Sequence, residues 1–259
     1  MTRKPLIAGN WKMNLNHLEA IAHVQRLAFS LKEEDFEEVD VLVLPPFTDM
    51  RSVQTLIDAD RLRIAFGAQD LSDKDNGAYT GQISGVFLSK LGCKYALTGH
   101  SERRGINAES SELVMQKTKA ALRNNITPIV CVGEPSDIRK NGNHVTYTLD
   151  QLEQSLSDLT KEMIKDIAIA YEPVWAIGTG EIATPQDAEQ MALEIRNWLV
   201  DRTSLTIAQG VRILYGGSVK SSTAAGIMAM PNIDGLLVGG ASIDPDEFVG
   251  ICRYRLAGV

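Results

Sequence analysis

Eight short apolar runs recur along the chain at intervals of about 30 residues, and each is followed by polar or glycine-rich residues. Several are continuously apolar at their centres, which is typical of parallel strands covered on both faces. The segments between the runs have helical spacing, so the alternation predicts an α/β fold built on a parallel sheet. The expected strands span residues 6–11, 39–44, 63–68, 95–98, 127–132, 166–171, 211–214 and 235–238.

Two α/β architectures compete for this pattern: a closed (β/α)8 barrel and an open, doubly wound sheet. Eight strand–helix repeats in 259 residues favour the barrel, whose typical length is about 250 residues. No proline- or glycine-rich linker divides the chain. We therefore predict a single domain over residues 1–259, with eight parallel strands surrounded by helices.

Particular residues mark the helices. Thr184 can cap a helix, Pro185 suits its first turn and Asp187 completes a capping-box pattern. Residues 244–247 repeat that pattern before the last helix. Apolar stripes are expected at Leu18, Ile21, Ala22, Gln25, Leu27 and Leu31 in one helix, and at Met191, Leu193, Ile195, Trp198 and Leu199 in another.

The formal net charge of −7 argues against nucleic acid or an anionic membrane as the main partner. An anionic substrate would therefore need a locally positive site. The three cysteines, Cys93, Cys131 and Cys252, show neither a zinc-binding spacing nor a disulfide framework. The N-terminal apolar stretch is too short for a signal peptide, and no run approaches the roughly 18 apolar residues of a membrane helix. We expect a cytoplasmic protein without a metal site.

Catalytic residues of a (β/α)8 barrel lie at the C-terminal ends of the strands and in the loops that follow. Applied to the expected strands, this rule brings together a lysine, a histidine, a carboxylate and two glycine pairs at one rim. The residues concerned are Asn10, Lys12, His100, Glu172, Gly216, Gly217, Ser218, Gly239 and Gly240.

The two glycine pairs indicate the kind of ligand. Glycine lets backbone N–H groups approach an anion closely, and phosphate sites after the seventh and eighth strands recur in such barrels. Ser218 adds another N–H group and a hydroxyl. Two ordinary tight turns are the alternative, but pairs on adjacent strands favour phosphate.

Lys12 and His100 can each be structural or functional. Lys12 follows Asn10 by two residues, so both would face one side of an extended segment, unless Lys12 is a surface lysine. His100 precedes Ser101-Glu102, which can begin a helical turn, and a helix N-terminus disfavours imidazolium and leaves a neutral hydrogen-bond donor. The remaining histidines, His17, His23 and His144, are expected on the surface.

Glu172 ends a buried strand, where a carboxylate is costly unless function requires it or a salt bridge pairs it. The next segment, residues 173–183, has stiff ends and a small, flexible middle, which suits a hinged lid. Within it, Gly178 to Ala183 formally matches a GxGxxG/A dinucleotide fingerprint, but Pro173 and Trp175 separate this match from the strand. We therefore expect no nicotinamide or flavin cofactor.

Motifs along the whole chain resemble those of the triosephosphate isomerase family, in the same order. They are GNWKMN, LTGHSERR, CVGE, AYEPVWAIGTG, YGGSV and VGGAS, of which HSERR and YEPVWAIGTG are highly specific. The resemblance implies interconversion of dihydroxyacetone phosphate and D-glyceraldehyde 3-phosphate, in glycolysis and gluconeogenesis, without cofactor or metal.

The resemblance also implies roles for individual residues. Glu172 would be the base that moves a proton between neighbouring carbons, and His100 would polarise the carbonyl. Lys12 and Asn10 would stabilise the negative charge of the enediolate. Substrate phosphate would be held by Gly178, Ser218, Gly239 and Gly240, with Ser101 and Glu102 as supporting residues.

Residues 69–85 are similar to the family's dimerisation loop. By this resemblance, Gln69, Tyr79 and Thr80 would lie at the interface of a homodimer. Asp70 departs from the family's usual amide, and residues 181–183 depart from its usual Lys-Thr-Ala. These departures bear on dimer stability and lid closure, not on the type of reaction.

The residues alone leave two other functions open. A binding protein for phosphorylated sugars would keep the glycine pairs but would not need Glu172, His100 or Lys12. A metal-dependent epimerase would need several His or Asp ligands at the rim, where only one histidine is expected.

Overall fold

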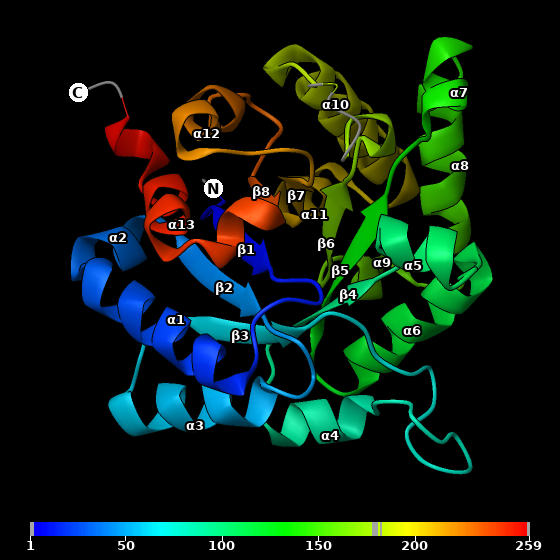
Figure 1. Cartoon of the computed structure of the whole chain (residues 1–259). Coiled ribbons are helices and arrows are strands. Elements are labelled where there is room, and N and C mark those ends of the chain that lie inside the picture. Colours follow the sequence, from blue (N-terminus) through cyan, green and yellow to red (C-terminus); the bar gives the residue numbers. More distant parts are fainter. Residues whose placement is uncertain (1–2, 178–180, 182, 258–259) are drawn as a thin grey trace.

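The eight strands close into a parallel barrel in the order of the sequence, with β8 pairing back onto β1 (Figure 1). This computed structural model describes residues 3–177, 181 and 183–257. Within them the prediction of an α/β barrel of eight parallel strands is confirmed. The strands are β1 (Leu6–Asn10), β2 (Asp40–Leu44), β3 (Ala65–Ala68), β4 (Tyr95–Thr98), β5 (Thr127–Val132), β6 (Ala168–Tyr171), β7 (Arg212–Tyr215) and β8 (Gly235–Val238).

Strands β4, β5 and β8 have the predicted bounds, and the others differ by one or two residues at their ends. The differences arise because buried residues continue past the ladder hydrogen bonds. Val39 and Val211, for example, are 1% and 0% exposed, yet each directly precedes its strand. An apolar run therefore marks a buried segment more accurately than it marks the strand itself.

Alternate strand residues face opposite sides of the barrel wall, which explains the continuous apolar runs. Leu6 and Ala8 belong to the cluster that fills the barrel, whereas Ile7 between them belongs to the layer under the helices. The inner cluster comprises Leu6, Ala8, Leu42, Leu44, Leu97, Ile129, Cys131, Ala168, Ala170, Leu214 and Leu237.

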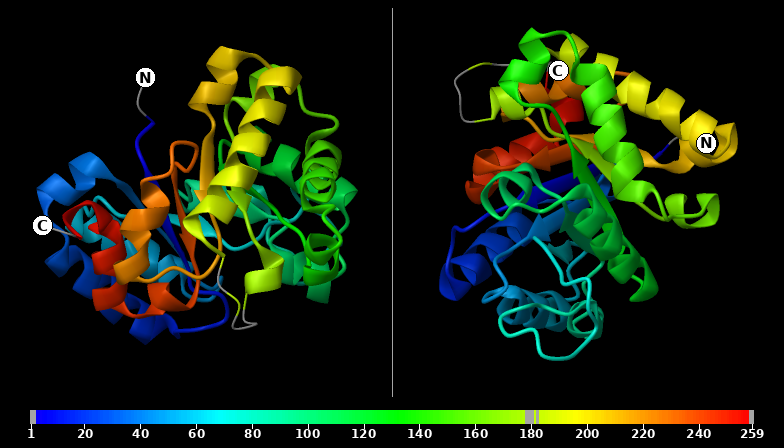
Figure 2. Two further views of the ribbon diagram at one scale, coloured as in Figure 1. Left: turned by 90° about the horizontal axis from the view of Figure 1, so that it is seen from above. Right: turned by 90° about the vertical axis from the view of Figure 1, so that its right-hand side faces the viewer.

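Helices surround the strands on the outside of the barrel, as the two further views in Figure 2 show. Among the helices of the described ranges, none offers an apolar stretch that could span a lipid bilayer. The helices are α1 (His17–Ser30), α2 (Glu33–Glu38), α3 (Met50–Asp60), α4 (Gly85–Lys90), α5 (Ser101–Ile106), α6 (Ser111–Arg123), α7 (Ser136–Lys140), α8 (His144–Leu156), α9 (Lys161–Ile164), α10 (Pro185–Arg202), α11 (Leu205–Gly210), α12 (Ser221–Met228) and α13 (Pro245–Cys252), with short 3-10 turns η1 (Val174–Ala176), η2 (Gly240–Ile243) and η3 (Tyr254–Leu256).

Helix α10 begins as predicted: Thr184 caps it in a capping box with Asp187, and Pro185 occupies its first turn. Asp244 likewise caps α13. On the apolar face of α10, Met191, Ile195 and Leu199 are buried. Leu193 is 43% exposed, so the prediction that Leu193 belongs to this stripe is wrong.

The predicted apolar stripe of α1 coincides only in part with the face that the helix buries: of its members, Leu27 and Leu31 are buried. The buried residues of the helix are Ala20, His23, Val24 and Leu27, whereas Leu18 is 66% exposed. These four residues follow the spacing i, i+3, i+4, i+7, and His23 occupies a position within that spacing. The prediction that His23 lies on the surface is therefore wrong. Its ring packs edge-on against Trp11, with 5.0 Å between the ring centroids.

The buried His23 is expected to make stability depend on pH. Burial lowers the pKa of His23 from 6.5 to about 4, although the Asp244 carboxylate opposes this shift. The unfolded chain binds a proton at His23 near pH 6.5, whereas the folded chain binds it only near pH 4, so protonation favours unfolding. The stability that neutral His23 provides is therefore complete above about pH 6.5 and is lost as the pH falls to about 4. Between pH 7 and pH 5, we expect a loss of about 2 kcal/mol in the free energy of unfolding.

Urea unfolding followed by circular dichroism at pH 7 and pH 5 measures this loss. His23→Gln is expected to reduce the dependence on pH. His17→Gln, at an exposed position of the same helix, should leave it unchanged. An identical pH dependence in both variants would contradict the assignment to His23.

Candidate active site

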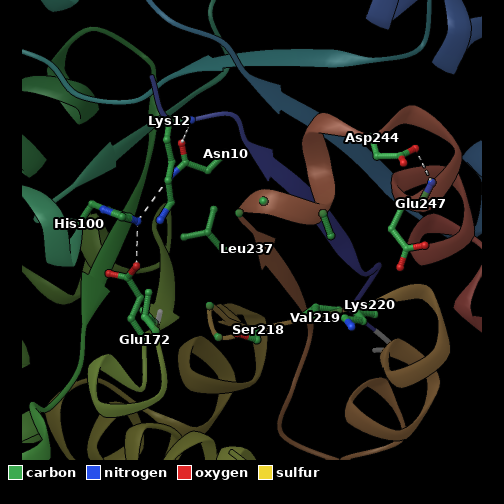
Figure 3. Close-up of a pocket in the computed structure, with 16 residues that line it drawn as sticks. Asn10, Lys12, His100, Glu172, Ser218, Val219, Lys220, Leu237, Asp244 and Glu247 are labelled. Atoms are coloured by element: carbon green, nitrogen blue, oxygen red, sulfur yellow. Dashed lines mark hydrogen bonds and ion pairs between the residues drawn. The ribbon is translucent and has the colours of Figure 1, made fainter. Parts of the chain in front are cut away.

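A cavity of about 660 Å³ opens at the C-terminal ends of the strands (Figure 3). Its lining includes seven of the eight residues predicted to be catalytic or to bind substrate, and these seven come from five separate parts of the sequence. Gly178, the eighth predicted site residue, lies outside the described residues. The seven are Asn10, Lys12, His100, Glu172, Ser218, Gly239 and Gly240.

Lys12 reaches the cavity from a sharp turn, not from the extended segment that its spacing predicted. Strand β1 ends at Asn10, and Lys12 has a φ of 54°, in the left-handed region. Two side chains hold this turn. Asn10 Oδ1 accepts a hydrogen bond from the Lys12 N–H at 3.0 Å, and Gln69 Nε2 donates to the Lys12 carbonyl at 2.7 Å. Gln69 also donates to the Leu44 carbonyl at 2.9 Å, so it ties together the ends of β1 and β2.

The Lys12 ammonium forms an ion pair with Glu102, with 2.5 Å between Nζ and Oε1. The lysine side chain is half-buried, which rejects the alternative of an ordinary surface lysine. Lys12 therefore places a positive charge inside the cavity of a protein whose net charge is −7.

His100 stands at the N-terminus of α5, as the sequence predicts. Its Nδ1 accepts a hydrogen bond from the Glu102 N–H at 3.3 Å, which leaves Nε2 to carry the proton of a neutral ring. Nε2 lies 2.9 Å from Glu172 Oε1 and 3.4 Å from Asn10 Nδ2. Burial by itself would lower the pKa of His100, but the adjacent Glu172 carboxylate outweighs burial and raises it. Movement of Glu172 away from the ring would remove that influence.

Glu172 is 1% exposed and keeps its charge through several partners. Its carboxylate accepts hydrogen bonds from the Ser101 N–H at 2.9 Å and from the Ser101 hydroxyl at 3.3 Å. Burial alone would raise the pKa of Glu172, but His100, the Ser101 N–H and Lys12 together lower it. The cavity thus contains an ionised carboxylate with little access to bulk water.

Two glycines lie beside these charged side chains. A Cβ atom at Gly216 would lie 2.9 Å from Cγ of Glu172, and one at Gly239 would lie 3.4 Å from Cε of Lys12. A Cβ atom at Gly216 would therefore displace Glu172, whereas one at Gly239 would make only an ordinary van der Waals contact with Lys12. Gly216 thus leaves the space that the base occupies.

The opposite wall of the cavity is formed largely of backbone. Ser218 follows β7, and Gly239 and Gly240 follow β8, whose chain turns at once into η2. The Ser242 hydroxyl donates to the Gly239 carbonyl at 2.7 Å and closes this turn. Nothing lies within 4 Å of a Cβ at Gly240, so the backbone there faces open space. Exposed backbone N–H groups of this kind can donate hydrogen bonds to a phosphate.

Several further residues line the cavity that the sequence did not single out. Lys220 and Val219 follow Ser218, and Asp244 and Glu247 lie at the start of α13. The rule that predicted Ser218 extends to Lys220, two residues further along the same rim. Ile177, Leu237 and Ala241 complete the lining, together with Gly216 and Gly217, which the sequence did place at this rim.

The predicted interface residues Tyr79 and Thr80 lie away from the cavity, at an exposed loop tip. The base of this loop is well held: the Ser72 N–H donates to the Ile83 carbonyl at 2.8 Å, and the Ser84 hydroxyl donates to the Asp75 carbonyl at 2.6 Å. Asp70 is buried and pairs with Lys117 at 2.6 Å. The loop therefore has a fixed base and an exposed tip.

An ionised carboxylate, an imidazole and an ammonium group thus share one cavity with a wall formed largely of backbone. Such an arrangement can remove a proton next to a carbonyl group in a small phosphorylated molecule. Within residues 3–177, 181 and 183–257, no group of three or more His, Cys, Asp or Glu side chains could hold a metal ion. That part of the chain therefore lacks the set of metal ligands that a metal-dependent epimerase would need.

Comparison with known proteins agrees with this chemistry. A model of the family described as triosephosphate isomerase matches residues 5–255. The chain is 59% identical over 254 residues to the triosephosphate isomerase of Streptomyces coelicolor and 58% identical to that of Streptomyces avermitilis, covering 98% of each chain. It is 55% identical over 258 residues to that of Rhodococcus jostii, covering 100% of this chain and 99% of the relative. Because the similarity spans almost all of the chain, the chain belongs to the triosephosphate isomerase family.

Proposed function

We propose that this chain interconverts dihydroxyacetone phosphate and D-glyceraldehyde 3-phosphate through an enediolate, in glycolysis and gluconeogenesis, without cofactor or metal. One observation carries the proposal: Glu172, His100 and Lys12 line the same cavity as the glycine pairs. A base, a proton donor and a cation therefore lie opposite an anion site. Membership of the family supports the same reaction.

Glu172 acts as the base. Its carboxylate removes a proton from the carbon beside the substrate carbonyl, and the electron pair of that C–H bond forms the enediolate double bond. The protonated Glu172 then returns the proton to the neighbouring carbon. In the structure Glu172 points at Ser101 and His100, so it has to turn toward the substrate before it reacts.

His100 and Lys12 stabilise the charge that appears on the substrate oxygens. The neutral ring donates its Nε2–H to the carbonyl oxygen, in the tautomer that the Glu102 N–H supports. It then takes up the proton of the neighbouring hydroxyl oxygen, which becomes the new carbonyl, so the ring ends with its proton restored. Lys12 supplies positive charge beside the same oxygen, with Asn10 next to it, and exchanges its Glu102 partner for the substrate.

Backbone N–H groups of Ser218, Gly239 and Gly240 hold the phosphate, with Gly178 as a fourth donor from the lid. We assign residues 173–183 as this lid. Its first hinge is supported by Pro173, by the short turn η1 and by Arg139, whose guanidinium lies 4.9 Å from the centroid of the Trp175 ring. Closure over the substrate would exclude water and protect the enediolate.

The reaction is tested by incubation with dihydroxyacetone phosphate in heavy water. Proton abstraction predicts deuterium on the carbon next to the carbonyl in recovered ketone and on the equivalent carbon of the aldehyde, both visible by NMR. Binding of the substrate without any incorporation of deuterium would leave a phosphorylated-sugar binding protein and refute the isomerase.

We also propose that the protein is a homodimer in which residues 69–85 contact the partner subunit. Met13, Phe47 and Tyr79 are 96%, 37% and 46% exposed. They follow β1, β2 and β3, whose ends Gln69 holds together, so the exposed apolar groups lie on neighbouring loops. An apolar patch of this kind is typical of a protein interface.

Tyr79→Lys is expected to shift the protein from dimer to monomer, because a charge would enter an apolar contact. Light scattering coupled to size-exclusion chromatography should give 28.3 kDa for the variant and twice this mass for the original chain. Specific activity of the variant should be lower than that of the original chain, because dissociation is expected to reduce activity. Phe29→Lys, at a 90% exposed position in α1 near the opposite end of the barrel, serves as the control. Equal masses for the two variants would argue against this interface.

We place the protein in the cytoplasm. The thiols of Cys93, Cys131 and Cys252 are free and buried, which suits a reducing compartment.

A further inference from the structure

The outer part of the cavity has an uneven distribution of charge. Two lysines line the cavity, Lys12 and Lys220, together with three carboxylates, Glu172, Asp244 and Glu247. The chain as a whole carries a net charge of −7. A doubly charged phosphate ester therefore approaches a protein that repels it, toward an opening in which carboxylates outnumber ammonium groups.

The two outer carboxylates are engaged by backbone and hydroxyl groups. Asp244 Oδ1 accepts hydrogen bonds from the N–H groups of Asp246 at 2.9 Å and Glu247 at 3.2 Å. Glu247 accepts hydrogen bonds from the Ser221 N–H at 2.7 Å and from the Ser221 hydroxyl at 3.1 Å. Both negative charges thus lie at helix N-termini, which offsets part of their repulsion.

The two lysines differ in what they bind. The Lys12 ammonium is paired with Glu102. The Lys220 side chain is exposed, and its ammonium forms no ion pair with any residue that the structure describes. Its backbone is fixed as the N-cap of α12: its N–H donates to the Thr223 hydroxyl at 3.0 Å, and its carbonyl accepts from the Thr223 and Ala224 N–H groups.

Lys220 stands at the edge of the wall formed by Ser218, Gly239 and Gly240, here called the phosphate wall. It follows Ser218 by two residues, and Figure 3 shows it between Ser218 and Glu247 at the border of the cavity. Its anchored backbone and unpaired ammonium form a cation that can swing over the cavity opening without losing a partner.

We propose that Lys220 attracts the phosphate dianion of the substrate and holds it at the cavity opening before the backbone N–H groups bind it. This inference rests on the proposed phosphate site. Lys220 acts on capture of the anion, whereas Glu172 and His100 perform proton transfer. It therefore affects kcat/KM and phosphate affinity, and leaves kcat nearly unchanged.

Lys220→Gln is expected to lower kcat/KM about 3- to 10-fold at low ionic strength, on the order of 0.02 M, with kcat within about a factor of two. The loss should shrink toward nothing at about 0.5 M salt, because the interaction is exposed and screened. Inorganic phosphate, used as a competitive inhibitor, should bind the variant about 3- to 10-fold more weakly under the same low-salt conditions.

Two further variants separate a local effect from a general one. Lys220→Arg keeps the charge and should restore both kcat/KM and phosphate inhibition. Lys165→Gln removes the same charge from an exposed position just before β6, at the opposite end of the barrel, and should match the original chain. Isomerisation of unphosphorylated D-glyceraldehyde should be equal in all four proteins.

The proposal is overturned if Lys220→Gln matches Lys165→Gln in kcat/KM and phosphate inhibition, or if its loss persists at high salt. It is also overturned if the loss appears in kcat. Failure of the isomerase assignment would look different, since the original chain would then show no turnover of the phosphorylated substrate.

Discussion

Replacement of Glu172 with Gln is expected to lower kcat by about 10²- to 10⁴-fold while inorganic phosphate binds almost as well as before. The amide has nearly the shape of the carboxylate and can still accept the hydrogen bond from the Ser101 N–H, which lies 2.9 Å from Oε2. It cannot take a proton from carbon at neutral pH. Because the phosphate wall is formed by other strands, anion binding should survive the loss of the base.

Steady-state kinetics with a coupled assay, combined with inhibition by phosphate, separates these two effects. Glu189→Gln provides the matched control: Glu189 is also hydrogen-bonded, accepting from Asn232 Nδ2 at 2.7 Å, but does not line the cavity. Near-normal turnover by Glu172→Gln would show that another group is the base. Loss of phosphate inhibition in that variant would instead indicate a collapsed site.

The sequence predicts the barrel well because burial on both faces leaves a strong signal. All eight predicted strands are present to within one or two residues at their ends, since a strand under a helix and over a packed interior has no polar face. Closure of the sheet also defines where chemistry can occur. Residues as distant as Asn10, His100 and Glu172 were grouped because the C-terminal ends of parallel strands meet at one rim.

The details that sequence reasoning missed depend on contacts between distant segments. The left-handed turn at Lys12 is held by Gln69, and no local pattern around Lys12 indicates that hydrogen bond. The sequence predicts His23 on the surface because it lies in a helical segment away from the strand ends, yet the spacing of α1 places it on the buried face beside Trp11. The helical spacing of α1 therefore decides the position of His23 in spite of its polar ring, and burial lowers its pKa.

Lys220 shows a third reason why a site residue cannot be predicted from the sequence. A lysine two residues after a glycine pair has no distinctive motif, and its importance appears only when the cavity reveals which cations already have partners. Charge balance within a site is a property of the folded arrangement. The sequence supplies only the total of −7.

Replacement of Lys12 with Met is expected to lower kcat/KM by about 10²- to 10³-fold, far more than the same loss of charge at Lys220. Both lysines line one cavity, but the Lys12 ammonium is half-buried beside His100 and Glu172, whereas Lys220 is exposed. The same charge interacts more strongly where less water surrounds it. Methionine keeps most of the volume of the side chain, so the effect reports the lost charge.

One consequence of this substitution needs a control, because it frees a neighbouring carboxylate. Glu102 pairs with Lys12 at 2.5 Å and also lies 3.7 Å from His100 Nδ1, so an unpaired Glu102 would disturb the imidazole. The double variant Lys12→Met/Glu102→Gln removes both charges and keeps the net charge of the site. If Lys12 stabilises the enediolate directly, the double variant stays as slow as Lys12→Met. Recovery to within about 10-fold of the original kcat/KM would show that Lys12 mainly neutralises Glu102, because a direct role should cost at least about 10²-fold in both variants.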